Sequence, residues 1–576
     1  MTCDTNANMD QKFVVKTHAA LAAFRKELAF PRTSIQLCLL GLVGGISAAS
    51  VIILFRLCIE WLQLQYLPEP DNFSALTTSQ RFFLPVIAAS VIIFVAYLTG
   101  FKHYRMGIPF VIHRVKHFFG QIPLMTSVNQ FIGGTIALAS GFSVGREGPS
   151  VHLGAAGSSF FGQWLKLPYN SIRILSGCGI AAGISASFNT PFAAVIFVME
   201  VVLREYRVHI FIPIMLAAAC GSVMTRLVFG STHELSFIQF TELSHWVYLY
   251  LILCGIALGG LASFFNNALM YLMHSFKRFN MVIRLLLAAL LTGLVGSFLP
   301  DAMGTHFYTA DALISTQNLG LIVAILAAKL LLTIVAIGLG VPGGIMGPVF
   351  VIGMLSGALL ASPLTVFMQD GAELTGSFSL LGMAGLMAAV VHAPLAALSA
   401  VMELSFSPEL ILPAILVIVP AYVTSTQFLG NSSIFIRQLD YQKLPYTTSP
   451  VLESLQKTGV LAVMDSHFKV LSEPQKEQLL TCLNQQPDQL VVQQSGLALA
   501  RQFSLVQLDV SLGQDSEPLN YTKMNGVGSQ ATLAEVYQLL QASRDGAVYV
   551  YEGNQDNISG IITWNKLRNY LHQASY

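Results

Sequence analysis

The sequence predicts an all-α polytopic membrane protein that carries a smaller α/β domain at its C-terminal end. Only 11% of the 576 residues are charged and 54% are hydrophobic, whereas about a quarter of residues are charged in soluble proteins. Long apolar runs recur from Ile35 to Phe428, so lipid must surround most of the chain. Charge returns beyond Val451, with 20 charged residues in the last 126 against 41 in the preceding 450, which predicts a soluble tail.

The chain ends indicate how the domains are arranged about the membrane. The first 30 residues are polar and carry four Lys or Arg residues ahead of the first apolar run. This is not the pattern of a cleavable signal peptide, and positive charge favours the cytoplasmic side. We expect residues 1–30 to be a cytoplasmic segment, 31–440 a transmembrane domain, and 441–576 a cytoplasmic linker and soluble domain. Both termini would then be cytoplasmic, in a multi-pass protein of the plasma or inner membrane.

Fourteen apolar segments can be located, and several are shorter than the roughly 20 residues that a membrane-crossing helix needs. Gly and Pro separate the short ones. Broken helices at membrane depth are tolerated only where protein or a water-filled cavity satisfies the freed backbone groups, which suggests a permeation pathway. The segments are residues 35–61, 82–98, 125–140, 151–165, 172–188, 192–203, 210–228, 247–272, 282–299, 319–339, 349–367, 380–391, 395–404 and 410–428.

An internal repeat divides the membrane region into two related halves. Residues 145–154 and 344–353 both read GxxGPxxxxG. Downstream of them, residues 191–200 and 394–403 both read P[FL]AAxxxxME. Two matched motifs in the same order indicate a structural repeat, and repeat-built transporters place their ion site where the broken helices of the two halves meet.

The GxxGP loops have the composition of a helix N-terminus that approaches a ligand. Gly145, Gly148 and Pro149 precede one apolar run, and Gly344 and Pro348 precede the other. Glycine permits a close backbone approach and proline is tolerated in a first helical turn. A helix N-terminus carries about half a positive charge, so two of them could stabilise a partly dehydrated anion without trapping it. One such loop could equally be a tight helix connection, but its repetition favours an anion site.

Glu147 lies inside the first loop, before the embedded helix. An ionisable residue at membrane depth is a functional-site hypothesis by default. We expect its carboxylate to compete with a permeating anion for the helix N-termini, so that protonation or outward rotation of Glu147 opens the path. The alternative is an ion pair with Arg146 at a loop surface.

Glu200 and Glu403 end the two ME repeats. Because they recur in both halves, a shared capping role is favoured over proton transfer. The histidines are spread too widely for a metal site. The chain offers no concentrated basic face for nucleic acid, with a net charge of +1.

Two other classes of protein, an intramembrane hydrolase and a membrane receptor, are alternatives. An intramembrane hydrolase would need Ser150 or Ser143 as nucleophile and His152 or His392 as base. Ser150 and His152 are two residues apart on a predicted helix and point in different directions, so we expect no enzyme. A receptor whose tail carries the function is the other alternative.

The motifs resemble the CLC family of chloride channels and proton-coupled chloride exchangers across nearly the whole chain. Residues 145–150 (GREGPS) and 344–348 (GIMGP) are similar to its second and third filter segments, and RMGIP at 105–109 is similar to the first, usually GSGIP. SFNTPFAA at 187–194 also fits the family pattern. The resemblance implies a homodimer with a separate pore in each subunit, inverted repeats, and Glu147 as the external gate.

The resemblance also implies the site residues. The anion-binding positions would be Met106, Gly107, Ile108, Arg146, Glu147, Ile345, Met346, Gly347 and Phe435, with backbone N–H groups of Ile345 and Met346 as donors. The filter loops would include Pro109, Gly145, Gly148, Pro149, Gly344 and Pro348.

Three positions depart from the family pattern. Met106 replaces the serine and Phe435 replaces the tyrosine whose hydroxyls normally reach the central anion. Val201 stands where exchangers carry an internal proton-transfer glutamate. These departures favour a chloride-conducting channel or a weakly proton-coupled pathway, with a proton/chloride exchanger as the alternative.

The tail resembles a degenerate CBS pair. A helix is predicted over Thr532–Leu540, a strand over Ala547–Tyr551, and a second strand at 560–563 followed by a helix through Tyr570. Lys566 replaces the aspartate of nucleotide-binding CBS motifs. We therefore expect no cofactor and a structural or dimer-stabilising role.

Overall fold

The structure is a computed structural model, and two compact units make up the chain. It describes residues 20–101, 106–230, 235, 238, 244–305, 318–367, 374–447, 449–486, 489–496, 501–508 and 519–574. One unit, here called the membrane unit, contains residues 38–161 and 173–446. The other, here called the tail unit, contains the chain up to Leu37, residues 162–172 and the chain from Thr447 onward.

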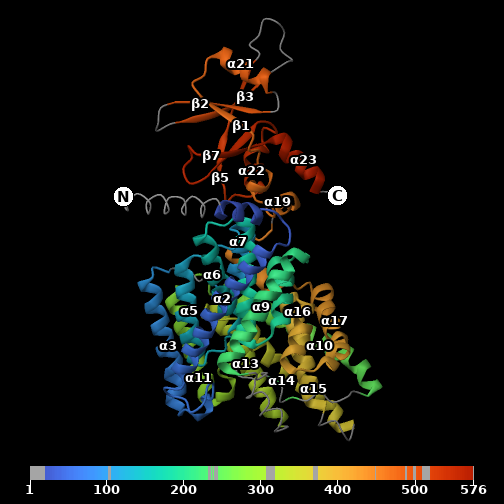
Figure 1. The fold of residues 1–576 in the computed structure, drawn as a ribbon. Coiled ribbons are helices and arrows are strands. Elements are labelled where there is room, and N and C mark those ends of the chain that lie inside the picture. The colour runs from blue at the N-terminus through green and yellow to red at the C-terminus, as the bar shows by residue number, and fades with distance from the viewer. Residues whose placement is uncertain are drawn as a thin grey trace, which may run out of the picture. The chain divides into compact units, whose positions relative to one another are not determined.

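The membrane unit is helical throughout its described residues (Figure 1). Ten helical stretches are long and apolar enough to cross a membrane. They lie in α2 (Ile35–Gln63), α3 (Thr78–Leu98), α7 (Tyr169–Phe188), α9 (Val208–Phe229), α10 (His245–Ser275), α11 (Met281–Phe298), α13 (Leu319–Leu339), α14 (Met346–Phe367), α15 (Leu374–Met387) with the π-helix η4 (Ala388–His392), and α17 (Ile411–Val423) with η5 (Pro408–Leu410) and η6 (Thr424–Phe428).

Between these helices run shorter or less apolar ones. They are η1 (Phe73–Ala75), α4 (Gly107–His117), α5 (Leu124–Ala139), α6 (Glu147–Trp164), α8 (Pro191–Phe197) with the π-helix η2 (Val198–Leu203), η3 (Pro300–Ala302), α16 (Pro394–Ser405) and α18 (Ile434–Gln442). All fourteen predicted apolar segments lie within helical backbone, apart from at most one terminal residue each, which confirms the polytopic helical class. Several of the helices begin three to six residues before the predicted segment.

Helix α4 was not among the predicted apolar segments. Its last turn holds Arg114, Lys116 and His117, which interrupt the apolar run, yet most of the helix is buried. Composition alone therefore hides a short helix whose charged end is covered by protein.

The repeated glycine of GxxGPxxxxG sets the same helix packing in both halves. A Cβ on Gly154 of α6 would overlap the carbonyl of Gly179 in α7. A Cβ on Gly353 of α14 would lie 2.7 Å from the Cα of Met383 in α15. In each half the absence of a side chain lets the helix that follows the loop touch the backbone of the next helix.

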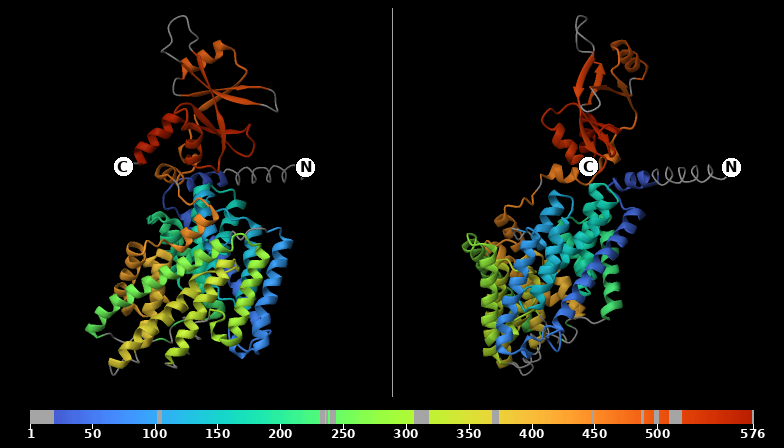
Figure 2. Two further views of the ribbon diagram at one scale, coloured as in Figure 1. Left: turned by 180° about the vertical axis from the view of Figure 1, so that it is seen from behind. Right: turned by 90° about the vertical axis from the view of Figure 1, so that its left-hand side faces the viewer.

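The tail unit contains two sheets, seen from two further sides in Figure 2. In the first, β1 (Phe468–Ser472) pairs in parallel with β2 (Leu490–Ser495), which pairs antiparallel with β3 (Gln502–Leu508), and β3 with β4 (Leu519–Lys523). In the second, β5 (Asn525–Gly528) is parallel to β6 (Ala547–Tyr551), and β6 is antiparallel to β7 (Ile558–Thr563).

Both sheets are built on the same order of elements. Helix α21 (Lys476–Gln485) connects β1 to β2, and α22 (Leu533–Leu540) connects β5 to β6. In each sheet a strand is followed by a helix, then by a second strand parallel to the first, and then by a third strand antiparallel to the second. The remaining helices are α19 (Pro450–Leu455), α20 (Val460–Val463) and α23 (Trp564–Ala574). The predicted helix at α22, strands at β6 and β7, and final helix at α23 are confirmed.

An ion pair joins Lys566, in the first turn of α23, to Asp465. Asp465 exchanges two backbone hydrogen bonds with Ile561, of 2.7 and 2.9 Å. Its Oδ1 accepts from the backbone N–H of His467 at 3.0 Å, and its Oδ2 lies 3.2 Å from Nζ of Lys566. The hydrogen bond from His467 first, and then Lys566, hold the pKa of Asp465 below its ordinary value. Lys566, the residue that departs from the nucleotide-binding pattern, is therefore paired within the fold.

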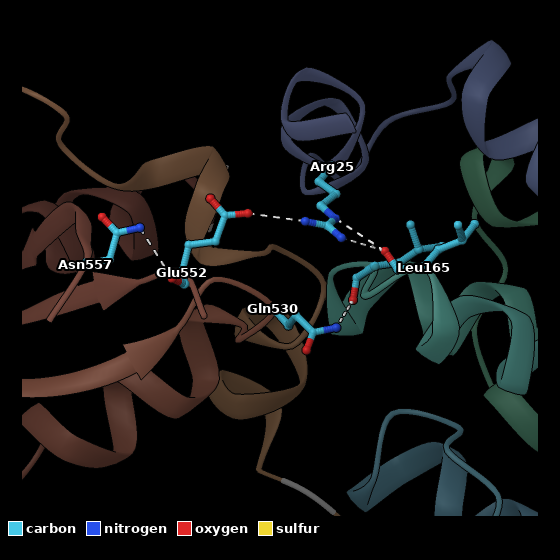
Figure 3. Close-up of polar contacts among 6 residues, drawn as sticks. Arg25, Leu165, Gln530, Glu552 and Asn557 are labelled. Carbon is cyan, nitrogen blue, oxygen red and sulfur yellow. Dashed lines mark hydrogen bonds and ion pairs between the residues drawn. The ribbon is translucent and has the colours of Figure 1, made fainter. Parts of the chain in front are cut away.

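Two residues far apart in the chain, Arg25 and Gln530, contact one short segment inside the tail unit (Figure 3). The guanidinium of Arg25 donates to the carbonyl of Leu165, at 2.9 Å through Nη2, and also pairs with Glu552 at 3.2 Å. Gln530 donates its side-chain amide to the carbonyl of Leu167 at 3.0 Å. These bonds give partners to two carbonyls just beyond the C-terminal end of α6.

Candidate functional site

The two GxxGP loops are joined directly to each other. Gly145 and Gly344 exchange two backbone hydrogen bonds, with N···O distances of 2.8 and 2.7 Å. The sequence repeat therefore places equivalent residues of the two halves opposite one another.

Around this bridge the loops are too close for side chains. A Cβ on Gly148 would lie 2.6 Å from the carbonyl oxygen of Gly343, and one on Gly344 would lie 2.5 Å from the backbone nitrogen of Gly148. Gly343 in turn packs against Val144. Glycine is needed here because backbone meets backbone.

Two helices begin at this junction. Helix α6 begins at Glu147 and α14 begins at Met346. Pro149 and Pro348 are therefore each the third residue of a helix, where a missing N–H costs no intrahelical bond. The prediction that Glu147 lies in the loop before the helix was wrong by a few residues, because the first turn already includes the proline.

The Glu147 side chain is buried, with 3% of its surface exposed. A Cβ on Gly344 would lie 2.8 Å from its Oε2, one on Gly347 would lie 2.9 Å from its Oε1, and one on Gly145 would overlap the carboxylate. The carboxylate of α6 thus lies against the first residues of α14. This is where an anion bound by the N-terminus of α14 would lie. The neighbouring Arg146 places its guanidinium 5.1 Å from the ring centre of Phe188.

A third helix begins beside the same junction. Helix α4 begins at Gly107, which has φ of +73°, and its N-cap Met106 makes no side-chain capping bond. Ile108 is buried within its first turn. Arg105, the first residue of the predicted filter segment at 105–109, lies outside the described residues. Three helix N-termini, those of α4, α6 and α14, therefore meet in this region.

A cavity of about 460 Å³ reaches all three helix starts. It is lined by Met106, Gly107, Ile108 and Pro109 of the first predicted filter segment, by Gly148 of the second, and by Gly344 and Ile345 of the third. Phe435 of α18 also lines it and is 1% exposed. Neither Met106 nor Phe435 has a hydroxyl to offer.

Seven polar residues of this cavity were not predicted from the sequence. They are Gln130 of α5, the cations Lys277, Arg284 and Lys443, and Gln438, Tyr441 and Gln442. No Asp or Glu occurs among the described residues that line it. Gln130 is one of several polar residues in its segment, and nothing in the sequence separates it from its neighbours. The cations come together only in the fold.

A second, apolar cavity of about 30 Å³ touches Glu147 on the other side of the junction. Ile184, Phe188 and Phe350 are among its lining residues, and Glu147 is the ionisable residue among those described there. Met346 lines this cavity while its neighbour Ile345 lines the larger one. The two joined loops thus separate the larger cavity from the smaller one, and Glu147 lies on the side of the smaller cavity.

The internal position Val201 is buried in the π-helix η2, with 5% of its surface exposed. Its side chain can neither accept nor release a proton. The preceding residue, Glu200, caps a helix of the other half.

Glu200 and Glu403 cap helices of the opposite halves. Glu200 accepts from the backbone N–H groups of Leu395 and Ala396 at 3.2 and 2.7 Å, at the start of α16. Glu403 accepts from Phe192 and Ala193 at 2.9 and 2.7 Å, at the start of α8. The predicted capping role is confirmed, and the structure adds that the two caps are exchanged between the halves.

The serine and histidine pairs required for hydrolysis are not assembled. Ser150 Oγ donates to the carbonyl of Arg146 at 2.8 Å, and Ser143 Oγ lies 2.9 Å from Oγ1 of Thr333. His152 Nε2 lies 3.3 Å from Oγ1 of Thr126. Among the described residues there is also no group of three metal-ligating side chains.

Comparison with known proteins gives one family. The family model described as voltage gated chloride channel matches residues 87–426. A protein of Ralstonia nicotianae named as a ClcB-like chloride channel protein is 26% identical over 431 residues, covering 72% of this chain and 100% of that relative. The H⁺/Cl⁻ exchange transporter ClcA of Salmonella agona is 31% identical over 319 residues, covering 53% of this chain and 67% of that relative.

A solved structure described as a eukaryotic CLC transporter has a similar fold. Its TM-score is 0.59 at 18% identity, and the match covers 92% of this chain and 97% of that one. The match therefore extends beyond the helical part and includes strand-containing sequence from the tail unit.

We predict that Glu403→Ala and Glu200→Ala each destabilise the protein by about 1–3 kcal/mol, because each leaves the first N–H groups of an embedded helix without an ionised acceptor. The midpoint of thermal unfolding in detergent measures this, with the exposed Glu409→Ala as the matched control. Equal losses for the two variants are expected, since the caps are equivalent. An unchanged midpoint for either variant would contradict the capping role.

Proposed function

This chain belongs to the voltage-gated chloride channel family, and on that premise we propose that it conducts chloride through a pathway gated by Glu147, as a channel or with weak coupling to protons. It is a multi-pass membrane protein with the CLC fold. Its family consists of ion channels and transporters, so the reading as a hydrolase has no support from its relatives.

One observation carries the proposal. The Glu147 carboxylate lies against the N-terminus of α14, within the contact distances of Gly344 and Gly347 given above. A carboxylate at that position excludes an anion from the same helix end. Movement or protonation of Glu147 would free the N–H groups of Ile345 and Met346 for chloride.

The side chains around the larger cavity support weak anion binding. Met106 and Phe435 line it in place of hydroxyl-bearing residues. Each lost hydrogen bond to an ion forfeits on the order of 1–3 kcal/mol. Low affinity favours rapid passage, because an ion must leave as readily as it enters.

The side chains around Glu147 support weak proton coupling. The small cavity beside Glu147 is lined mainly by apolar residues, and Val201 is buried and apolar. A proton that reaches Glu147 meets no titratable relay among these described residues. The named activity of the Salmonella relative keeps proton/chloride exchange as the second candidate, which the same measurement decides.

Membership of the family supports a proposal for the arrangement in the cell. We propose a homodimer in which each subunit has its own anion pathway, in the plasma or inner membrane, with both termini cytoplasmic. The larger cavity, lined by the C-terminal end of α18 (Gln438–Lys443), would then face the cytoplasm.

We further propose that the tail is a degenerate CBS pair that acts structurally. The two strand-helix-strand-strand units support the pairing. The bond between Lys566 and Asp465 supports a site that does not accept adenine nucleotide.

Proteoliposomes with independent chloride and pH gradients distinguish the two candidates. We expect the reversal potential to follow the chloride gradient and to shift little with the pH gradient. Stoichiometric uphill proton movement driven by chloride would replace the channel by the exchanger. Absence of any chloride-dependent potential would reject both.

Replacing the proposed gate changes the response to pH. Glu147→Gln keeps the shape of the side chain but removes its titration, so we expect chloride flux at neutral pH to rise several-fold and its pH dependence to disappear. Flux measured between pH 4.5 and 7.5 tests this, with Glu409→Gln as a control for charge removal at an exposed site. A variant that keeps the wild-type pH profile would remove Glu147 as the gate.

Calorimetric titration of the full-length protein with ATP and AMP tests the tail. We expect no saturable heat at millimolar nucleotide. Saturable binding that is lost in the tail-deleted chain would overturn the structural role.

A further inference from the structure

Gln130 of α5 is a buried amide whose donor is unused. Only 1% of the residue is exposed, and its side-chain nitrogen has no hydrogen-bond partner among the described residues. An amide left in this state destabilises the fold, because its lost bonds to water are not replaced. Buried donors without partners in native proteins call for an explanation, and an absent ion is one of them.

Packing fixes the face of α5 on which Gln130 lies. A Cβ on Gly133 would lie 3.0 Å from the ring of Pro342, and one on Gly134 would lie 3.1 Å from the ring of Pro149. Residues three and four positions apart share a helix face. Gln130 therefore lies on the face of α5 that packs against both filter loops, one turn before the contacts themselves.

From this face Gln130 reaches the larger cavity. It lines that cavity together with Gly148 and Gly344, which belong to the two joined loops, and with Ile345. Gln130 thus shares this cavity with the helix starts to which we assign the anion.

The preceding residue provides a contrast within the same helix. Asn129 is also buried, but its amide nitrogen donates to the carbonyl of Met125 at 2.9 Å and its oxygen accepts from Thr99 at 3.0 Å. Both polar atoms of the Asn129 side chain are therefore satisfied within the fold. Gln130 lacks such a bond at its nitrogen.

The charges of the cavity determine the class of ligand. Lys277, Arg284 and Lys443 line it, and no acidic residue is present among its described lining residues. A cation would find no compensating carboxylate among these residues, whereas an anion would find three positive side chains and the amides of Gln130, Gln438 and Gln442. The cavity selects for negative charge.

We propose that the side-chain nitrogen of Gln130 donates a hydrogen bond to a small monovalent anion in the larger cavity, and that it supplies the side-chain donor that Met106 and Phe435 lack. The inference rests on the proposed function and adds the residue that determines affinity on this side of the filter. A neutral amide binds the ion without the long residence that a full cation would impose. It also favours chloride over larger anions such as thiocyanate, which accept hydrogen bonds poorly.

Gln130→Met tests the donor, because methionine has a similar length and no N–H. We expect the dissociation constant for chloride, measured by isothermal titration of the full-length protein in isethionate buffer, to rise about tenfold. The permeability ratio of thiocyanate to chloride should rise as well. The thermal unfolding midpoint should stay equal or increase, since an unpaired buried amide is removed. Asn129→Leu is the matched control, and it should lower the midpoint without changing the selectivity ratio.

Gln130→Glu gives an independent measurement. A carboxylate at this position should suppress chloride binding at neutral pH, and acidification should restore it. If both Gln130 variants bind chloride as the wild type does, the inference is overturned. Because the titration reads binding directly, chloride binding that depends on Gln130 in a protein without chloride flux would refute the proposed function and leave this site standing.

Discussion

The paired hydrogen bonds between Gly145 and Gly344 are the constraint on which the site depends. They bring the two loops to a distance at which no side chain fits, as the contacts of Gly148 and Gly343 show. Because the loops are glycine-rich, Gly344 and Gly347 place no side chain over the start of α14, and the Glu147 carboxylate can lie against it. A chain with few embedded charges can therefore still present positive ends to an anion.

One device recurs three times in the membrane unit: a carboxylate from one half lies at a helix N-terminus of the other. Glu200 does so at α16 and Glu403 at α8, in each case with two hydrogen bonds. Glu147 does so at α14, but there a cavity of about 460 Å³ lies on the other side of the loops. The first two carboxylates have no alternative occupant to compete with them. In the proposed function the third would share its place with the ion, and that difference would make it a gate.

The sequence was sufficient for everything that depends on repetition and hydropathy. The fourteen apolar segments, the two halves and the capping role of the ME glutamates were all predicted from local patterns. The exchange of the caps could not be, because nothing near Glu200 indicates that its partners are Leu395 and Ala396. Gln130 was missed for a related reason: one polar residue among several in a helix becomes informative only when the fold shows that its nitrogen is unpaired.

Because the caps are exchanged between the halves, the start of α8 can be capped only after the second half has been translated. Phe192 and the oxygen of Glu403 that accepts its N–H are 211 residues apart in the chain. At about 5–20 residues per second, translation needs roughly 10–40 s to cover that interval. During this time the backbone N–H groups at the start of α8 lack their Glu403 acceptor. Nascent chains halted between the halves should therefore depend on water, lipid headgroups or an insertion factor to satisfy those backbone groups.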